Sequence, residues 1–361
     1  MVDVCLHPAL FGEKERLLLT SDGVKASLFR YDTGVAAVRL AIERGHIIVL
    51  PYLGQMLWDA NFDGVRLGMG HRYPAPRPAK VISETYGCLA FHSGLLRNGS
   101  PSPADTHQLH GEFPCAALQS ASLEVGSDGR GAFVRLAGRR EHIDGFTTHY
   151  VARPSITMRP GNTLLEIGMA VENCSDTPMD LMYNCHINFA FVEGGRILQA
   201  AAYTPGNVSV RTAVPEHVQT TPAYLKLIKD LADNPARMAS LDPSLGFDPE
   251  QVFYLSNLGC DEDGRTHVML RRPEGDGFAV SFSPTEFPHP TRWLLRNKNV
   301  QAAGIALPAT CRPEGYLAEQ HAGRVRSLAA EATASFHVGL GYLDRLAAER
   351  LESTICRLTS R

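Results

Sequence analysis

Short apolar runs separated by glycine or proline recur along most of this sequence, and they constrain its fold more than any other feature. Between Ala26 and Leu67 the separating residues are Gly45, Pro51 and Gly54, which are typical of turns that join strands. The three runs that they delimit are 36–40, 46–50 and 55–59. Most runs last about five to eight residues, the usual length of an antiparallel strand. The pattern predicts an all-β, antiparallel fold.

Short apolar runs separated by turn residues continue further along the chain, and two stretches with the spacing of a helix interrupt them. The additional strand-like runs are 117–125, 132–136, 147–153, 155–159, 164–171, 179–191 and 278–283. Tyr224–Ala232 has apolar residues at helical spacing and lies between Pro222 and Pro235, which predicts a helical insertion. Residues 343–358 have the spacing of an amphipathic helix, which can dock on a sheet or pair with a second copy in a homodimer. Neither helix alternates regularly with strands, so the pattern does not favour a doubly wound parallel sheet.

Composition and charge narrow the class of ligand. A length of 361 residues fits one large domain or two smaller ones, and 44% hydrophobic with 20% charged residues is ordinary for a globular protein. The net charge of -3 comes from 35 basic and 38 acidic residues that are mixed along the chain. We therefore expect neither a nucleic-acid partner nor an anionic membrane surface. The first residues show no basic stretch followed by an apolar run, and no run of about 18 apolar residues occurs in the sequence. We therefore expect a cytoplasmic protein with reduced cysteines.

Two histidine motifs are the strongest indication of chemistry. They are Leu109-His110-Gly111-Glu112 and Asn184-Cys185-His186-Ile187-Asn188-Phe189. Strand-like surroundings would hold each imidazole rigidly, and a rigid imidazole suits proton transfer near neutral pH. A histidine in an apolar strand can also be a buried residue with both nitrogens satisfied.

The order of several short motifs resembles that of the aldose 1-epimerase (galactose mutarotase) superfamily, with the closest likeness to a poorly characterised branch. The motifs are Gly45–Gly54, the segment 94–112, Asn184–Phe189 and Ala306–Thr310. The resemblance covers roughly residues 25–340. It implies a β-supersandwich, a twisted two-layer antiparallel assembly with a sugar site in a groove, with 1–361 as one domain and a C-terminal helix over 343–358.

The resemblance also implies roles for the histidines. Exchange of anomers requires removal of a proton from the C1 hydroxyl and delivery of a proton to the ring oxygen. His186 would protonate the ring oxygen, and His110 would hydrogen-bond the same oxygen or a neighbouring hydroxyl. Relatives carry a glutamate immediately before the residue that matches Pro308, where this chain has Leu307. The candidates for a replacement carboxylate are Glu286, Glu314, Glu112 and Asp180, with Glu314 preferred as the base.

Other polar or aromatic residues near these motifs are candidates for contacting the substrate. They are Arg72, His107, Glu112, Asn184, Asn188, Phe189 and Glu286. Trp58, Trp293 and Phe191 fit a core role better, because aromatic residues in strands are usually packing residues. The cluster from His107 to Glu112 could supply metal ligands, but two histidines three apart on a strand point to opposite faces. We therefore expect no metal and, without a phosphate loop or dinucleotide fingerprint, no other cofactor.

The expected function is cofactor-independent interconversion of the anomers of a monosaccharide or related keto-sugar. The first alternative is a sugar-binding or sensing protein that lost its base, which Leu307 favours. The second is a metal-dependent sugar isomerase that uses the cluster at 107–112.

Overall fold

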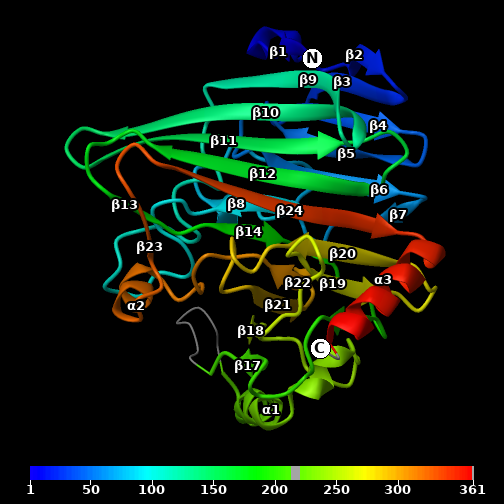
Figure 1. Cartoon of the computed structure of the whole chain (residues 1–361), viewed down its shortest axis with the longest axis vertical. Helices are drawn as coiled ribbons and strands as arrows, with labels where there is room; N and C mark the ends of the chain where they lie inside the picture. Colours follow the sequence, from blue (N-terminus) through cyan, green and yellow to red (C-terminus); the bar gives the residue numbers. More distant parts are fainter. Residues whose placement is uncertain (213–219, 360–361) are drawn as a thin grey trace.

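The computed structural model describes residues 1–212 and 220–359, which form three large antiparallel sheets and one small one (Figure 1). In order across the sheet, the nine-stranded sheet contains β1 (Val2–Cys5), β9 (Ser120–Asp128), β10 (Gly131–Asp144), β11 (Thr148–Met158), β12 (Leu164–Asn173), β24 (Thr333–Leu343), β20 (Gly277–Phe282), β19 (Thr266–Arg271) and β16 (Arg196–Gln199). The eight-stranded sheet contains β14 (Asn184–Ile187), β8 (Ala90–Ser93), β6 (Met56–Phe62), β5 (Gly45–Leu50), β4 (Ala36–Ile42), β3 (Val24–Arg30) and β2 (Arg16–Ser21), with β7 (Val65–Arg66) paired to β6. The five-stranded sheet contains β15 (Phe189–Ala190), β22 (Gln301–Leu307), β21 (Thr291–Arg296), β18 (Gln251–Leu255) and β17 (Val208–Val210), and β13 (Met179–Leu181) pairs with β23 (Arg326–Leu328).

Alternation of apolar and polar residues explains the layered packing. Along β12 every second side chain is buried and the others are partly or fully exposed, as expected for a strand with one face on the core. Ile156 and Ile167 of the nine-stranded sheet share one apolar cluster with Val38 and Ile47 of the eight-stranded sheet. The two sheets therefore pack face to face, and the all-β, two-layer fold predicted from the sequence is confirmed.

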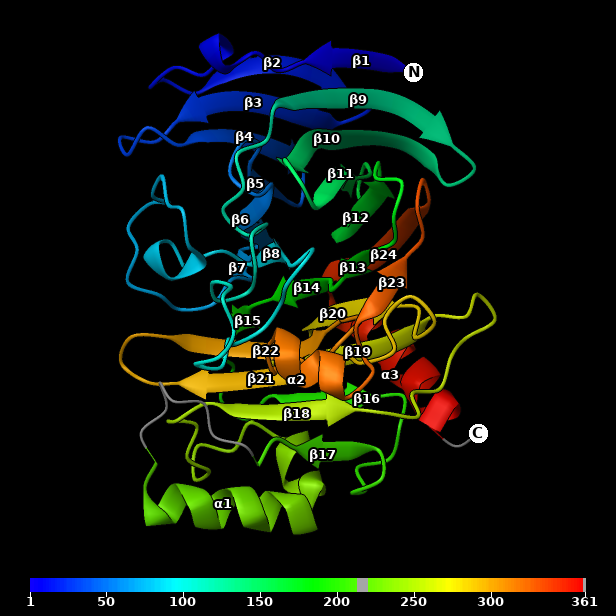
Figure 2. The same cartoon turned by 90° about the vertical axis from the view of Figure 1, so that its left-hand side faces the viewer.

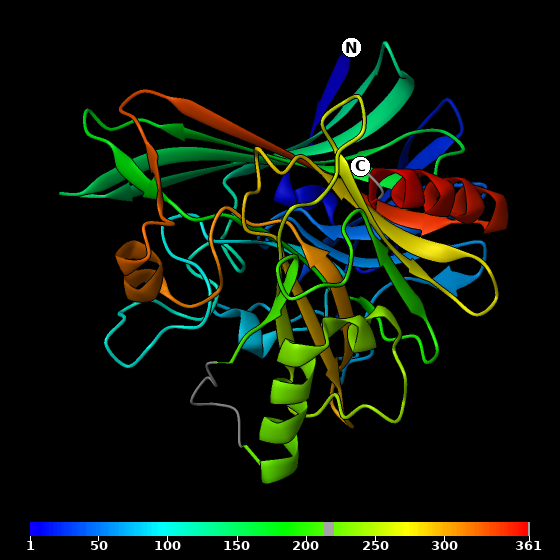
Figure 3. The same ribbon diagram turned by 60° about the horizontal axis from the view of Figure 1, so that its bottom comes forward.

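Both predicted helices are present, and a third was missed. α1 (Pro222–Asp233) begins after Thr221, whose hydroxyl accepts a hydrogen bond from the Tyr224 backbone N–H. α3 (Arg345–Thr359) packs against β16, β19 and β24, so the C-terminal helix docks on the sheet (Figure 3). α2 (Tyr316–His321) was not predicted, because six residues are too few to display a helical repeat. The 3-10 turns are Pro8–Leu10, Ile82–Glu84 and Pro235–Ala239.

Several predicted strand boundaries differ from the structure, and in two places the difference changes how the chain pairs. The sequence divides 147–159 at Pro154, yet β11 continues through it: Pro154 pairs with Met169 of β12, while pairing with β10 is interrupted between the Ala137–Ser155 and Arg140–Ala152 pairs. A proline lacks the N–H that a ladder needs, and here only one side of the strand loses its bonds. The predicted run 179–191 is instead β13, β14 and β15, in three different sheets.

No helix within residues 1–212 and 220–359 combines the length and the apolar composition needed to span a membrane.

Candidate functional site

The second histidine motif lies where two sheets meet. β14 pairs with β8 on one side, and on the other the Cys185 backbone N–H donates to the Pro308 carbonyl at 2.9 Å. β15, two residues further on, pairs with β22 of the five-stranded sheet, so β14 and β15 lie between the two sheets in Figure 2. Side chains alternate along β14. Cys185 and Ile187 enter the core, whereas Asn184 and His186 line a cavity.

A tight turn presents the first histidine to the same cavity. His110 has a φ of 62° and Gly111 a φ of 79°, the left-handed region that favours glycine. A Cβ at Gly111 would lie 1.9 Å from the Arg97 carbonyl oxygen, so position 111 requires glycine. The His110 backbone N–H donates to the Gly99 carbonyl, and the Gly94 N–H donates to the His110 carbonyl, each at 2.9 Å. The segment 94–99 therefore clamps the histidine in place.

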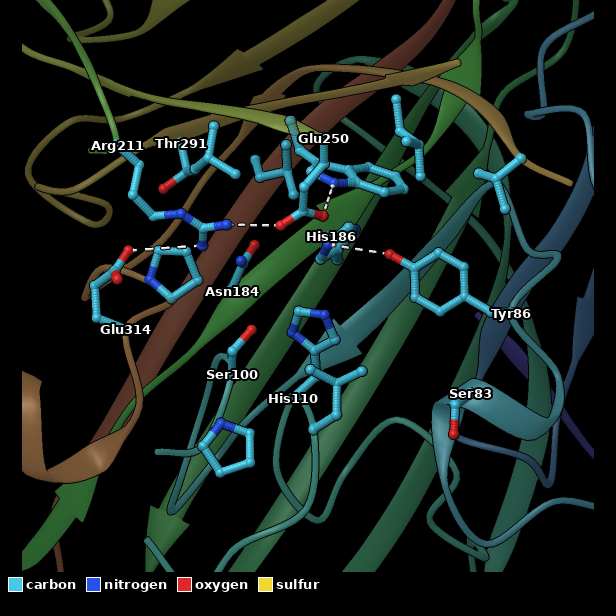
Figure 4. A pocket seen from close by; sticks show the side chains of 18 of the residues that line it. Ser83, Tyr86, Ser100, His110, Asn184, His186, Arg211, Glu250, Thr291 and Glu314 are labelled. Atoms are coloured by element: carbon cyan, nitrogen blue, oxygen red, sulfur yellow. Dashed lines mark hydrogen bonds and ion pairs between the residues drawn. The ribbon is translucent and has the colours of Figure 1, made fainter. Parts of the chain in front are cut away.

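The two imidazoles lie in edge-to-face contact on the wall of a cavity of about 1090 Å³. Their ring centroids are 4.9 Å apart with the planes at 74°, and Figure 4 shows His110 and His186 with Asn184 beside them. Phe91 stacks on His186 at a centroid distance of 4.6 Å and also contacts the edge of the His110 ring. Further walls come from Tyr86, Arg211, Glu250, Trp293, Leu307 and Glu314. Segments distant in the sequence thus converge on one partly open, largely apolar cavity, as ligand sites do.

The protonation state of His186 follows from its burial and its partner. Nδ1 lies 2.9 Å from the Asn188 side-chain oxygen, and the Asn188 amide nitrogen donates to the Cys88 carbonyl at 3.1 Å. Burial, and then the neighbouring His110 ring, lower the pKa of His186 well below its ordinary value, against the opposing effect of the Asn188 hydrogen bond. The lowered pKa keeps the ring neutral near pH 7, and the Tyr86 hydroxyl oxygen lies 3.4 Å from its Nε2. This state differs from the protonated acid that the resemblance implies, because an ionised imidazole is costly in a buried site.

A carboxylate does reach the cavity, from a position that the sequence did not indicate. Glu250, immediately before β18, places one oxygen 2.6 Å from the Arg211 guanidinium, and its other oxygen accepts from the Trp293 indole N–H at 2.7 Å. Glu314 also lines the cavity, accepts a hydrogen bond from the Tyr254 hydroxyl and lies 3.8 Å from Arg211. Leu307 packs with Trp293 in an apolar cluster on the cavity wall. The wall therefore carries two carboxylates, Glu250 from the residue before β18 and Glu314 from the segment after β22, although Leu307 of β22 itself is apolar.

The structure brings some of the residues proposed from the sequence together. The cavity is lined by Arg72, His110, Asn184, His186 and Glu314. Arg72 is exposed, whereas Asn184 is 1% exposed, and its side-chain oxygen accepts no hydrogen bond from any residue that the structure describes. Asn184 thus offers a ligand an unused acceptor.

Other proposed residues lie outside the cavity and have structural partners. The Glu112 carboxylate accepts from the Leu95 and Leu96 N–H groups at 2.8 Å, and Glu286 accepts from the His337 N–H at 2.7 Å. These carboxylates satisfy backbone donors instead of facing a ligand. Asp180 accepts from the Tyr316 hydroxyl and Arg97, and Phe189 stacks on Phe278 in the core.

His107 and Asn188 also lie outside the cavity. His107 accepts from the Tyr316 backbone N–H at 3.3 Å, and Asn188 lies behind His186. Among the described residues, no three histidine, cysteine, aspartate or glutamate side chains gather closely enough to hold a metal ion. His107 accepts a hydrogen bond from the Tyr316 N–H, whereas Glu112 accepts one from the Leu95 N–H. The side chains of the cluster at 107–112 therefore do not point towards one shared ligand position.

Sequence reasoning missed Arg211, Glu250, Tyr86 and Thr291 and assigned Trp293 to the core. Their local sequences carry little signal, since Glu250 simply precedes the buried run Gln251–Leu255.

A second buried histidine beneath the site gives a prediction about acid stability. Burial lowers the pKa of His92, on β8, to about 3, and its Nδ1 pairs with the Tyr183 hydroxyl at 2.8 Å. The folded chain keeps this ring neutral while the unfolded chain binds a proton below about pH 6.5. Its contribution to stability is therefore complete above that pH and falls by about 1.4 kcal/mol per pH unit down to about pH 3.

We expect the free energy of unfolding to fall by about 2 kcal/mol more between pH 7 and pH 5 in the natural protein than in His92→Gln, which removes this titration. Glutamine keeps a polar partner for Tyr183. Urea unfolding at the two pH values measures the difference, and an equal loss in both proteins would contradict the assignment.

Comparison with known proteins places this geometry in context. Residues 32–341 match the model of a family described as "Domain of unknown function (DUF4432)". The structure superimposes on a proposed aldose 1-epimerase from Klebsiella pneumoniae with a TM-score of 0.79 at 19% identity, covering 95% of this chain and 91% of that one. For a galactose mutarotase-like protein from Clostridium acetobutylicum the TM-score is 0.58 at 12% identity, covering 90% and 100%. At these identities the likeness shows a shared galactose mutarotase-like fold.

A curated relative matches over a shorter segment. It is a 5-oxoprolinase subunit from Chloroflexus aurantiacus, 26% identical over 148 residues, which is 37% of this chain and 56% of that protein. The chain thus matches little more than half the length of that relative, and the match carries no argument about activity.

Proposed function

The chain belongs to the DUF4432 family, and from that premise we propose that it binds a monosaccharide or related keto-sugar in the cavity and interconverts its anomers. The observation that carries the proposal is the pair of imidazoles, with ring centroids 4.9 Å apart, on the wall of one cavity. Two rigid nitrogen-bearing rings at this spacing can both reach oxygen atoms of a single sugar ring. The galactose mutarotase-like fold of the solved structures supports the same substrate class.

The proposed reaction uses His186 as the proton carrier. Nε2 takes the proton of the C1 hydroxyl, the bond between C1 and the ring oxygen breaks with its electron pair moving to that oxygen, and the ring oxygen takes up a proton. The imidazolium formed at His186 can return that same proton, because both oxygens are bonded to C1. Rotation about the bond from C1 to C2 and the reverse steps give the other anomer. A neutral histidine thus performs the base step for which Leu307 is unsuited.

The remaining walls suit the other groups of a sugar. Glu250 and the free acceptor of Asn184 can receive hydrogen bonds from hydroxyls, and hydrogen bonds to a charged group contribute about 1.5–3 kcal/mol. Trp293 and Leu307 offer apolar surface to the C–H groups of a sugar face. His110, which contacts the His186 ring, can reach a neighbouring ring or hydroxyl oxygen of the same sugar.

Saturation-transfer NMR on aldoses with purified protein tests the proposal. Exchange between α and β anomer signals should be faster than in a protein-free blank for at least one sugar. If no aldose or ketose in a broad panel exchanges faster than the blank, the catalytic proposal fails.

The second candidate is a sugar-binding or sensing protein without catalysis. The observation that favours it is Leu307, whose side chain lines the cavity where relatives carry a glutamate. Saturable binding of a sugar, measured by calorimetry, together with exchange at the blank rate would select this candidate.

A further inference from the structure

We propose that Asn188 is a positioning residue that fixes the tautomer of His186, so that Nε2 is the proton acceptor of the site. The kinetic part of this inference rests on the proposed function, whereas the tautomer itself does not. Asn188 is fully buried and does not line the cavity. Any effect of this side chain on the chemistry must therefore pass through His186.

The hydrogen bonds around Asn188 allow one orientation of its amide. The amide nitrogen donates to the Cys88 carbonyl at 3.1 Å, which turns the side-chain oxygen towards Nδ1 of His186 at 2.9 Å. Rotating the amide by 180° would place two oxygens against each other at Cys88 and an N–H group against Nδ1. Because an oxygen of an amide only accepts, Nδ1 must carry the proton, and Nε2 is left with its lone pair.

The backbone of Asn188 prevents the side chain from moving away. Its N–H donates to the Leu89 carbonyl at 2.6 Å, and its carbonyl accepts from the Met69 N–H at 2.9 Å. The Asn188 backbone is thus hydrogen-bonded on one side to Leu89, which precedes β8, and on the other to Met69, two residues before the cavity-lining His71. The imidazole is held independently by its stacking on Phe91. Both partners of the Nδ1 hydrogen bond are therefore fixed before any substrate binds.

The assignment has a mechanistic consequence. The opposite tautomer would present an N–H to the cavity, and the ring could then donate a hydrogen bond but not accept the proton of a sugar hydroxyl. Enzymes in which a histidine is held in the wrong tautomer lose most of their rate while keeping their geometry. Groups that orient metal-bound histidines through their second nitrogen contribute about 10- to 100-fold, and we expect an effect of similar size here.

Nitrogen-15 NMR of the full-length protein near pH 7 tests the tautomer without requiring activity. The imidazole signals of His186 are identified by their absence in His186→Gln. We expect a protonated Nδ1 and an unprotonated Nε2. A proton on Nε2, or a rapidly averaged pair of nitrogens, would overturn the inference even if the protein proves to be an active mutarotase.

The variant Asn188→Leu then tests the role. Leucine keeps the volume and removes the acceptor, so the His186 signals should lose the fixed tautomer. The turnover number for anomer exchange should fall about 10- to 100-fold with KM unchanged, since Asn188 does not touch the cavity. Asn162→Leu, the same substitution at an exposed turn, serves as the control.

The outcomes separate the two proposals. A turnover number equal to that of the natural protein, or a loss carried by KM, would refute the positioning role. If the natural protein shows the expected tautomer but no exchange with any sugar, the proposed function fails and the tautomer assignment stands. If Asn188→Leu does not fold, the spectrum of the natural protein still decides the tautomer.

Discussion

Replacing His186 with glutamine should slow anomer exchange by about 10²- to 10⁴-fold, the usual contribution of a group that transfers a proton. Glutamine occupies a similar volume and can still hydrogen-bond, but it neither accepts nor returns a proton near neutral pH. Because the side chain is 4% exposed and packs on Phe91, retaining its volume also avoids opening a void. We therefore expect the loss in the turnover number, with substrate binding largely retained.

Exchange rates from saturation-transfer NMR, with circular dichroism as a check on folding, measure this effect. His337→Gln is the matched control, since His337 is an exposed histidine on β24, outside the cavity. An unchanged rate in a folded His186→Gln protein would remove this histidine from the mechanism. Equal losses in the two variants would mean that the effect is not specific to the cavity.

Replacing Glu250 with glutamine should lower kcat/KM by about 10- to 100-fold, mainly by raising KM. The physical reason is that a carboxylate accepting from a sugar hydroxyl contributes about 1.5–3 kcal/mol, and about 1.4 kcal/mol corresponds to a factor of ten. Glutamine should also weaken the hydrogen bonds that position this side chain on the cavity wall. Its amide can match either the Arg211 guanidinium or the Trp293 indole N–H, but not both, because each of these groups only donates.

Glu193→Gln provides the control for this change. Glu193 forms an ion pair with Arg296 at 2.9 Å on the surface, the exposed counterpart of the buried pair between Glu250 and Arg211. Exposed pairs contribute little, so this variant should behave like the natural protein. A Glu250→Gln protein with unchanged KM and a reduced turnover number would instead assign Glu250 to proton transfer. Unchanged values of both would exclude it from the site.

The fold class and the second histidine motif could be inferred from local sequence because their signals are local. Alternation with a period of two, as in β12, reports burial of one strand face within a few residues. The helical spacing of 224–232 and 343–358 is equally local, and both segments are helical. The local pattern gave the wrong strand boundaries at Pro154 in β11 and over 179–191. In both places the neighbouring strands, which are distant in the sequence, determine which residues pair.

The composition of the site depended on packing that no local pattern reports. Order along the chain indicated His110 and His186 through a resemblance, but Glu250 reaches the same cavity only because β18 lies beside β21, where Trp293 holds its carboxylate. Glu112 and Glu286, equally acidic in the sequence, are turned to backbone N–H groups.

The charge state of His186, and the tautomer proposed for it, likewise depend on tertiary structure. The sequence determined that a histidine stands in a buried strand beside an asparagine. Only the folded chain brings the Cys88 carbonyl to the amide of Asn188 and the His110 ring to the edge of the imidazole. Strand identity follows from neighbours in sequence, whereas the charge state of a buried group follows from neighbours in space, because desolvation and hydrogen bonding act through contact.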